Sequence, residues 1–384
     1  MMFSSDLLIV FFSFNLVIIS VNGLTDSNLI NLDAIIPCFK IRCYSQNLGC
    51  FKPLISGLII LFPPISVCPE TPSIVNLTFR VANQENPAMF LESPSTRHPY
   101  SRLTPDRSLA FYSHGCFGSY ADKFSLFTGL GLLRDYYQVV LSDWVRGANP
   151  PIILKQPAII NLFLCTANCE IVGRKVANAY NFAVTRLGIN PENITVVGHS
   201  AGSASTHFTA VWLQERYKMT PYETIALDVV SDPYQPSTVF GVSKLDAIYN
   251  TAVHTTYNFP VPIVSHVPAA LDLKVGSPFA LSHTDLFVNA PFGLIVKQPP
   301  CGLLPFCSHF YAIIVYMASL FGCQFEPCSS SFLFPGQSSG PTGVASSVYG
   351  RRGTLCISVS AYPLTECKCN QTKGGNLRKH RILN

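Results

Sequence analysis

The sequence has few charged side chains. Asp, Glu, Lys and Arg make up only 12% of its 384 residues, against 48% hydrophobic residues, and the formal net charge is +5. The small basic excess is spread along the chain except for one cluster in the C-terminal tail, formed by Lys373, Arg378, Lys379, His380 and Arg381. We interpret this cluster as a solvated chain end rather than a contact for anionic lipid or nucleic acid. The charge pattern therefore predicts no nucleic-acid partner.

Patterns that hold metal ions are also missing. Cys165 and Cys169 are close in sequence, as are Cys367 and Cys369, but no His or Cys pair lies at a useful distance to complete a zinc site. We expect these cysteines to form disulfides, and we predict neither a metal nor a cofactor. The sequence has no internal repeat.

Long hydrophobic runs are restricted to the N-terminus. Residues 1–23 contain an apolar core from Leu7 to Val21 and then the small residue Gly23, which predicts a secretory signal peptide cleaved near Gly23. No Lys or Arg precedes the core, which is atypical, and an uncleaved anchor is the alternative. The short apolar run favours the signal peptide, and no later stretch is long enough for a second membrane span.

The cysteine content fits an exported protein. Fourteen cysteines permit full pairing in an oxidising compartment. Three Asn-x-Thr triplets, at Asn76, Asn193 and Asn370, are glycosylation acceptors if the chain passes through a eukaryotic secretory pathway. We therefore predict a secreted, extracellular protein.

Strand and helix patterns alternate along the middle of the chain. Period-two or continuously apolar runs predict strands over 74–82, 107–115, 136–144, 193–199, 224–232 and 246–255. Apolar residues recur at helical spacing over 171–188, and a second helical stretch follows Gly202. This alternation predicts an α/β domain with a mostly parallel sheet.

Four regions are predicted along the chain. They are a signal peptide (1–23), a Cys-containing N-terminal segment (24–68), the α/β domain (69–365) and a basic tail (366–384). Residues 53–67 and 150–165 are apolar, broken by proline and without a clear period. They are either genuine insertions or translated non-coding sequence, and composition does not separate the two.

The stretch ITVVGHSAG, residues 194–202, carries the most specific chemical signal. A predicted strand leads into Gly198-His-Ser200-Ala-Gly202, and a helix follows, which is the context of a nucleophile elbow. A sharp turn of this kind needs glycine where a Cβ would collide with neighbouring backbone. It would place Ser200 at a helix N-terminus, where free amides favour an oxyanion. The alternative is a structural glycine-rich bend.

A nucleophilic serine needs a base and an orienting acid, which follow it in the order acid, then histidine, in this type of fold. The next strand offers Asp228 and Asp232 as acids. Six histidines follow Ser200, at positions 207, 254, 266, 283, 309 and 380. We interpret His207 and His254 as structural and His380 as part of the tail, which leaves His266, His283 and His309 as candidate bases.

Eight segments resemble, in order, the pancreatic lipase and phospholipase A1 superfamily. They include CYSQNLGCF (43–51), FYSHGCF (111–117), SDWVRGA (142–148), the elbow with its preceding helix, CSHFYAIIVYMASL (307–320) and RRGTLCISVSAYP (351–363). The resemblance implies an α/β-hydrolase fold and a Ser-Asp-His triad. It assigns Ser200 as nucleophile and His309 as base. It favours Asp232, in an Asp-Pro-x-x-Pro turn, as the acid, with Asp228 as the alternative.

The resemblance also implies secondary features of the site. The oxyanion donors would be the amides of Cys116 and Ala201, at positions where the family usually has Phe and Leu. Disulfides would join Cys43 to Cys50 and Cys301 to Cys307. The second pair encloses five residues in place of a long lid, so phospholipid becomes as good a candidate substrate as triacylglycerol.

Other family features are absent. Only Asp246 matches the family's structural calcium ligands, so we do not predict calcium. The chain stops soon after the predicted domain, so we do not expect colipase as a partner. We predict a secreted hydrolase of lipid esters, acting through an acyl-enzyme at a membrane or lipid surface. The alternatives are an inactive lipid-binding protein on the same fold and a type-B carboxylesterase, which the lack of a His-Gly-Gly-Gly loop disfavours.

Overall fold

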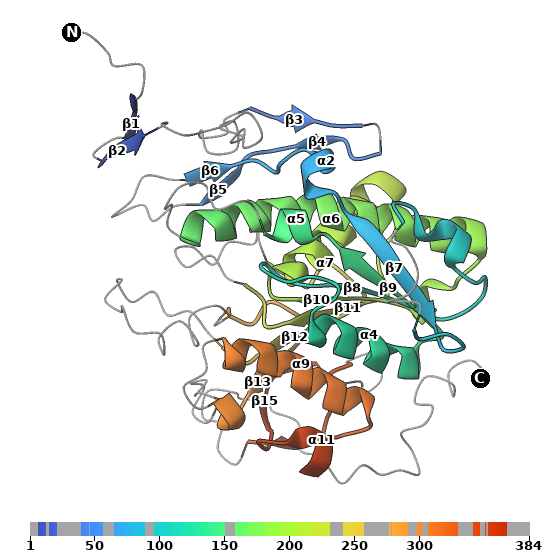
Figure 1. Cartoon of the computed structure of the whole chain (residues 1–384). Helices are drawn as coiled ribbons and strands as arrows, with labels where there is room; N and C mark the ends of the chain where they lie inside the picture. The colour runs from blue at the N-terminus through green and yellow to red at the C-terminus, as the bar shows by residue number, and fades with distance from the viewer. Residues whose placement is uncertain are drawn as a thin grey trace.

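A computed structural model shows how the chain folds (Figure 1). It describes residues 7–12, 15–20, 40–45, 47–56, 65–88, 96–149, 158–230, 241–256, 276–277, 279–290, 298–301, 306–328, 341–345, 350 and 352–366.

The central element is a sheet of nine described strands. Across the sheet they run β7 (Thr78–Asn83), β9 (Gln138–Asp143), β8 (Leu109–Ser113), β10 (Ile194–His199), β11 (Glu223–Leu227), β12 (Tyr249–His254), β13 (Thr284–Val288), β15 (Gly353–Ser358) and β14 (Glu326–Pro327). The strands from β9 to β15 are all parallel, while β7 and β14 pair antiparallel at the two edges. The mostly parallel α/β fold predicted from the sequence is confirmed.

Helices cover both faces of the sheet (Figure 1). Helices α4 (Lys123–Asp135) and α9 (Cys307–Leu320) pack on one face over side chains such as Val197 and Leu286. Helices α6 (Ala158–Leu187) and α7 (Ala201–Trp212) pack on the other face over Phe111 and Val196. Because the parallel strands are buried on both faces, they read as continuous apolar runs rather than as alternating ones.

Short elements complete the described structure. Three hairpins precede the sheet: β1 (Leu7–Phe12) with β2 (Asn15–Ser20), β3 (Arg42–Cys43) with β4 (Cys50–Phe51), and β5 (Leu54–Ser56) with β6 (Ile65–Val67). The remaining helical turns are α2 (Pro72–Val75), η2 (Pro99–Arg102), α5 (Val145–Ala148), η3 (Pro191–Asn193), η4 (Leu213–Tyr217), η6 (Pro299–Cys301) and α11 (Pro363–Glu366). In the described part of the chain, no helix combines the length and apolarity needed to cross a bilayer.

The largest departure from the predicted elements is the start of α6. The sequence pattern predicts a helix from residue 171, whereas the helix begins at Ala158. Every residue from Leu164 to Cys169 is buried, apolar or not. A stretch of helix that is buried on all sides has no amphipathic period, which is why the sequence pattern does not extend the helix back over residues 164–169. Similarly, part of the 53–67 segment forms the β5–β6 hairpin, while residues 57–64 and 150–157 lie outside the described residues. The predicted region boundaries remain predictions.

Candidate active site

Ser200 lies in the turn between β10 and α7, in a strained backbone conformation. Its φ is +58° and its ψ is −128°. A side chain rarely adopts such angles unless the surrounding structure fixes them. Here the Ser200 N–H donates to the Leu227 carbonyl at 2.9 Å, and its own carbonyl accepts from the Ser203 N–H at 2.9 Å. The structure thus has the sharp strand-to-helix turn that the sequence predicts.

The two elbow glycines are required by close backbone contacts. A Cβ added to Gly198 would lie 2.1 Å from the Gly202 carbonyl oxygen, and a Cβ added to Gly202 would lie 2.1 Å from the Ser113 carbonyl oxygen. Both contacts are with backbone, which cannot move aside as a flexible side chain can. The elbow is therefore wedged between α7 and the end of β8.

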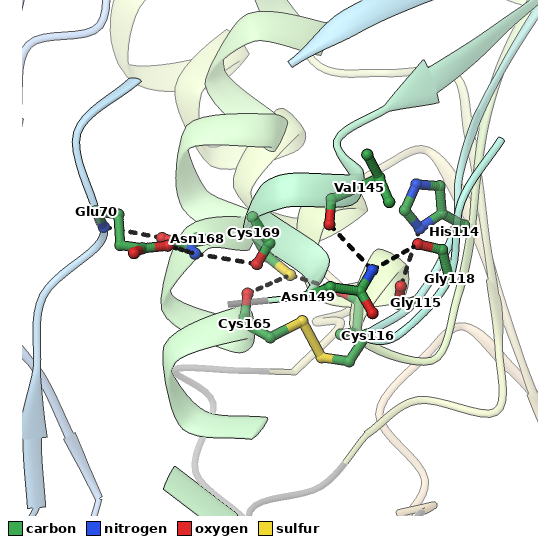
Figure 2. Close-up of a disulfide and its surroundings, with 12 residues drawn as sticks. Glu70, His114, Gly115, Cys116, Gly118, Val145, Asn149, Cys165, Asn168 and Cys169 are labelled. Atoms are coloured by element: carbon green, nitrogen blue, oxygen red, sulfur yellow. Dashed lines mark hydrogen bonds between the residues drawn. A yellow bond between two sulfur atoms is a disulfide. The ribbon is translucent and has the colours of Figure 1, made fainter. Parts of the chain in front are cut away.

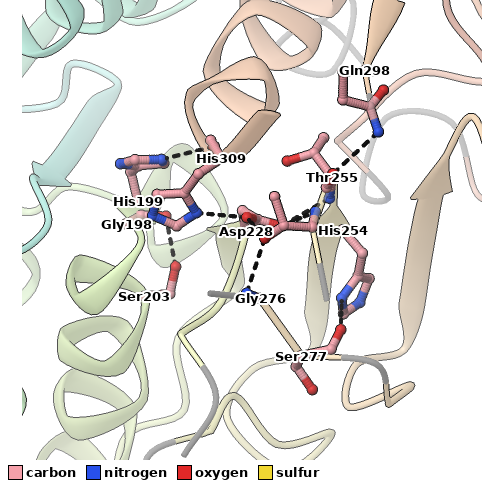
Figure 3. Close-up of polar contacts among 11 residues, drawn as sticks. Gly198, His199, Ser203, Asp228, His254, Thr255, Gly276, Ser277, Gln298 and His309 are labelled. Atoms are coloured by element: carbon pink, nitrogen blue, oxygen red, sulfur yellow. Dashed lines mark hydrogen bonds and ion pairs between the residues drawn. The ribbon is translucent and has the colours of Figure 1, made fainter. Parts of the chain in front are cut away.

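His309 is held at the start of α9. It is the third residue of that helix and is 4% exposed. Its Nδ1 lies 2.6 Å from Oδ2 of Asp228, and its carbonyl oxygen lies 3.2 Å from Nε2 of His199 (Figure 3). Because Asp228 engages Nδ1, the other ring nitrogen, Nε2, is the one available for proton transfer to or from a neighbouring group.

Asp228 follows the last residue of β11 and is completely buried. Its φ of +48° is left-handed, a conformation that Asp tolerates better than most residues. Its Oδ1 accepts the N–H groups of Thr255 at 2.7 Å and of Thr256 at 2.9 Å, and its Oδ2 accepts the Thr256 hydroxyl as well as His309. The carboxylate is thus surrounded by donors from the end of β12 and from α9.

These donors keep Asp228 ionised. Burial by itself would raise the pKa of this carboxyl, but the hydrogen bond from His309, the charge of its ring and the two threonine contacts outweigh burial. The net effect is a pKa below the usual value for aspartate. A fixed negative charge at this position suits a group that orients a histidine and stabilises its protonated form.

Of the two candidate acids, the structure describes Asp228. The resemblance favours Asp232, which lies outside the described residues, and gives Asp228 as the alternative. The carboxylate that contacts His309 is that of Asp228. The preference for Asp232 rested on a following proline, whereas the position of Asp228 depends on its place directly at the carboxyl end of β11. We therefore assign Asp228 in the proposal below.

Other histidines have structural partners. His254 is fully buried, with Nδ1 2.9 Å from the Ser277 carbonyl oxygen and Nε2 3.0 Å from Oδ1 of Asp285. His207 lies 2.9 Å from Oδ1 of Asp246, the one residue that matched a calcium ligand. These contacts agree with the interpretation of His207 and His254 as structural histidines. His266 and His380 lie outside the described residues.

The loop after β8 crosses over Ser200. A Cβ added to Gly115 would lie 2.6 Å from Cβ and 2.9 Å from Oγ of Ser200, so the loop backbone touches the serine. Within the described part of the chain, the N–H of Cys116 forms no hydrogen bond. Ala201 is the first residue of α7, where amides lack intrahelical acceptors. Both residues predicted to supply oxyanion donors are therefore placed around Ser200.

An apolar cavity of about 620 Å³ lies next to this site. Its walls come from the N-terminal ends of α4 and α9, from Pro300 and from residues 361–364. Phe310, which follows His309, lines the cavity and also stacks on His199 with ring centroids 5.1 Å apart. Phe310 thus lies between the cavity and His199, the residue before Ser200. The sequence reasoning did not identify the cavity, because its lining residues come from four separate segments.

The structure forms the two expected disulfides, Cys43–Cys50 and Cys301–Cys307. It adds Cys116–Cys165 and Cys328–Cys356, which the sequence did not predict. The expectation that Cys165 and Cys169 are disulfide partners is wrong, because Cys165 pairs with Cys116 and Cys169 is a buried free thiol. Two glycosylation candidates, Asn76 and Asn193, are half-buried at the ends of α2 and η3, and Asn370 lies outside the described residues. Residues 302–305 of the short disulfide loop also lie outside them.

The sequence relatives of the chain include lipases and phospholipases A1. Pancreatic triacylglycerol lipase of Oryctolagus cuniculus is 29% identical over 259 residues, which make up 64% of this chain and 49% of the lipase. Phospholipase A1 2 of Vespa affinis is 22% identical over 330 residues, or 84% of this chain and 88% of that protein. The resemblance to the pancreatic lipase and phospholipase A1 superfamily is confirmed. The chain spans about half the length of the pancreatic lipases it matches.

Solved structures align with a smaller share of the chain than these sequence relatives do. No protein-family model matches the chain. An esterase of Pyrobaculum calidifontis aligns with 34% of this chain and 39% of its own, at 18% identity and a TM-score of 0.25. The esterase LipW of Mycobacterium marinum aligns with 47% of this chain and 64% of its own, at 14% identity and a TM-score of 0.26.

Proposed function

We propose that this chain is a carboxylic ester hydrolase that acts on lipid esters through Ser200, His309 and Asp228. The observation that carries the proposal is the 2.6 Å contact between His309 Nδ1 and Asp228 Oδ2, both buried beside the strained Ser200 turn. A histidine fixed in this way by a buried carboxylate is the arrangement that activates a serine. The sequence similarity to lipases and a phospholipase A1 supports the same reaction class.

The proposed reaction proceeds through an acyl-enzyme. Nε2 of His309 removes the proton from Ser200 Oγ as that oxygen attacks the ester carbonyl carbon. The carbonyl oxygen becomes an oxyanion bound by the N–H groups of Cys116 and Ala201. His309 then donates its proton to the leaving alcohol, and the C–O bond breaks. A water molecule deprotonated by His309 hydrolyses the acyl-enzyme, releasing the carboxylic acid and restoring Ser200.

Each protein group has a separate contribution in this scheme. Asp228 holds the ring of His309 with the proton on Nδ1 and stabilises the imidazolium that forms. Each oxyanion donor contributes on the order of 10²–10³ in rate. Backbone amides supply both donors, so having Cys and Ala in place of Phe and Leu alters the shape of the acyl site rather than the donors themselves.

The surroundings of the site favour a lipid substrate. The apolar cavity beside Phe310 offers space for an alkyl chain, and the one cation among its described lining residues, Lys123, is exposed at the start of α4. A loop of five residues between Cys301 and Cys307 is too short to cover a wide site. We propose phospholipid or triacylglycerol, presented at a membrane or lipid surface, as the substrate. The disulfides fit an oxidising compartment, and we propose that the protein is secreted.

Release of fatty acid from phosphatidylcholine and from trioctanoin tests this proposal. The secreted wild-type protein is assayed beside the Ser200→Ala variant. Cleavage of phosphatidylcholine at the sn-1 position, lost in the variant, would support a phospholipase A1 activity. Cleavage of trioctanoin alone would support a lipase and contradict the argument from the short loop. Folded wild-type protein with no activity on either lipid, or on a soluble ester, would contradict the proposal.

A further inference from the structure

Three cysteines gather behind the proposed oxyanion hole. Cys116, in the loop after β8, forms a disulfide with Cys165 of α6 across 49 residues of sequence (Figure 2). One helical turn later, the thiol of Cys169 donates to the Ala201 carbonyl at 3.1 Å and to the Cys165 carbonyl at 3.4 Å. A single turn of α6 therefore contacts both residues whose amides are proposed to bind the oxyanion.

This turn of α6 is firmly held on its other side. Asn168, between the two cysteines, is completely buried. Its amide nitrogen donates to Oε2 of Glu70 at 2.8 Å and to the Gly147 carbonyl at 3.1 Å, and its oxygen accepts the Glu70 N–H at 2.8 Å. Cys165 and Cys169 are also fully buried. The turn is thus a rigid base to which a loop can be fixed.

Hydrogen bonds hold the loop on both sides of Cys116, at Gly115 to the His114 ring (2.9 Å) and at Gly118 to the Asn149 side chain (3.1 Å), but in the described part of the chain none is made by the N–H of Cys116 itself. Cys116 and Phe117 form a turn in which the Gly118 N–H reaches the Gly115 carbonyl at 3.3 Å, near the upper limit for such a bond. Phe117 has a φ of +61° and is 60% exposed, so its side chain does not anchor the loop in the core. Its N–H donates to the Ala148 carbonyl at 2.9 Å, which fixes one point beyond Cys116. The disulfide is the tether that acts directly on Cys116.

We infer that the Cys116–Cys165 disulfide positions the oxyanion hole, with Cys165 as a positioning residue that fixes the amide of Cys116 over Ser200. The inference rests on the proposed function. A bulky apolar side chain at position 116 could hold the loop by packing. Here the residue is a cysteine, and its covalent bond to α6 holds the loop instead. Without the bond, the loop would sample other turn conformations, and the Cys116 N–H would leave the position it must occupy during the reaction.

The test compares the Cys116→Ala/Cys165→Ala double variant with wild type on p-nitrophenyl butyrate. We expect kcat to fall by about tenfold or more, up to the factor of about 10²–10³ that loss of one oxyanion donor costs. KM should change little, because the donor acts mainly in the transition state. The matched control is Cys43→Ala/Cys50→Ala, which removes an exposed disulfide of the N-terminal hairpin and should leave kcat unchanged.

A thionoester substrate separates positioning from general loosening of the fold. Replacing the carbonyl oxygen by sulfur weakens hydrogen bonds to the developing anion. Wild type should therefore prefer the ester strongly over the thionoester. The Cys116→Ala/Cys165→Ala variant should lose most of that preference, while loosening elsewhere would slow both substrates alike. An unchanged kcat together with an unchanged ester-to-thionoester ratio, in folded variant protein, would overturn the inference.

Two further results keep the inference apart from the proposed function. If the alanine variant does not fold, Cys116→Val/Cys165→Val keeps apolar bulk without the covalent bond, and the same two measurements apply. If wild type lacks turnover that depends on Ser200, the proposed function fails. If wild type has that turnover and neither double variant alters kcat or the substrate ratio, only the role of the disulfide fails.

Discussion

Nδ1 of His309 lies 2.6 Å from Oδ2 of Asp228, although 81 residues separate the two in sequence. Asp228 follows β11, and His309 opens α9, which packs on the sheet face that includes β11 side chains. Parallel strands bring their carboxyl ends to one edge, so residues that follow β10, β11 and β12 meet there. Ser200, Asp228 and Thr256 are such residues, and α9 delivers the histidine to them.

Asp228→Asn tests which aspartate serves as the acid. An asparagine at this position would present the wrong hydrogen-bonding partner to His309, and we expect kcat to fall about 10⁴-fold, with the fold retained. Asp232→Asn is the matched control and should have little effect on kcat. Steady-state kinetics on a soluble ester give both values. A large fall in kcat for Asp232→Asn and a small one for Asp228→Asn would show that Asp232 is the acid.

Gly202→Ala tests the packing of the elbow. The added methyl group would lie 2.1 Å from the Ser113 carbonyl oxygen, so the backbone must shift. We expect the free energy of unfolding to fall by about 3 kcal/mol or more. Gly350→Ala is the comparison, because its Cβ would meet nothing within 4 Å and only its φ of +65° opposes it, at a cost of about 1–2 kcal/mol. Urea denaturation measures both values. If the two variants lose equal free energy of unfolding, the backbone contact at Gly202 does not constrain the turn.

Buried histidines should make the fold sensitive to acid. Burial lowers the pKa of His199 to about 3 and of His114 to about 4. The unfolded chain takes up a proton on each near pH 6.5, but the folded chain does not until far lower pH, so stability falls as pH decreases from about 6.5 toward 4. At pH 5 each histidine should account for a loss of about 2 kcal/mol relative to pH 7.

The variant His114→Phe measures one such contribution. Phenylalanine keeps an aromatic ring over Trp144, on which His114 stacks with centroids 5.2 Å apart. The difference in unfolding free energy between pH 7 and pH 5 should be smaller in the variant by about 2 kcal/mol. A pH dependence identical to wild type would show that His114 is already protonated in the folded protein at pH 5.

Filling the apolar cavity should change acyl-chain preference. Ile314 lines the cavity one helical turn beyond Phe310. Ile314→Phe would occupy part of the space and should shift the ratio of kcat/KM toward short-chain over long-chain p-nitrophenyl esters. Leu245→Phe, at a position that is 79% exposed and outside the cavity lining, is the control and should leave the ratio unchanged. The same chain-length profile in both variants would mean that the acyl chain binds elsewhere.

The sharp turn that holds Ser200 could be predicted from the sequence because its requirements are local. Ser200 and its two glycines lie within five residues, between a recognisable strand and helix. The predicted core strands are confirmed for the same reason, since each carries its own apolar pattern. His309 needed the family resemblance, because nothing in its local sequence separates it from His283. The fold itself was predicted from strand and helix alternation.

What the sequence missed depends on contacts between distant segments. The choice between Asp228 and Asp232 turns on where β11 ends and which carboxylate then faces α9. The Cys116–Cys165 bond joins a loop to a stretch of helix, residues 164–169, that is buried on every side and carries no amphipathic period. The threonine donors to Asp228 come from the end of another strand. None of these contacts could be predicted from a fixed spacing of residues in the sequence.

Covalent labelling by a fluorophosphonate tests the central claim most directly, because the reagent modifies only an activated serine. We predict stoichiometric labelling of wild type, with the added mass on the peptide that contains Ser200. We predict no labelling of Ser200→Ala and strongly slowed labelling of Asp228→Asn. Wild-type protein that is folded and stays unlabelled, or that is labelled at another serine, would contradict the account.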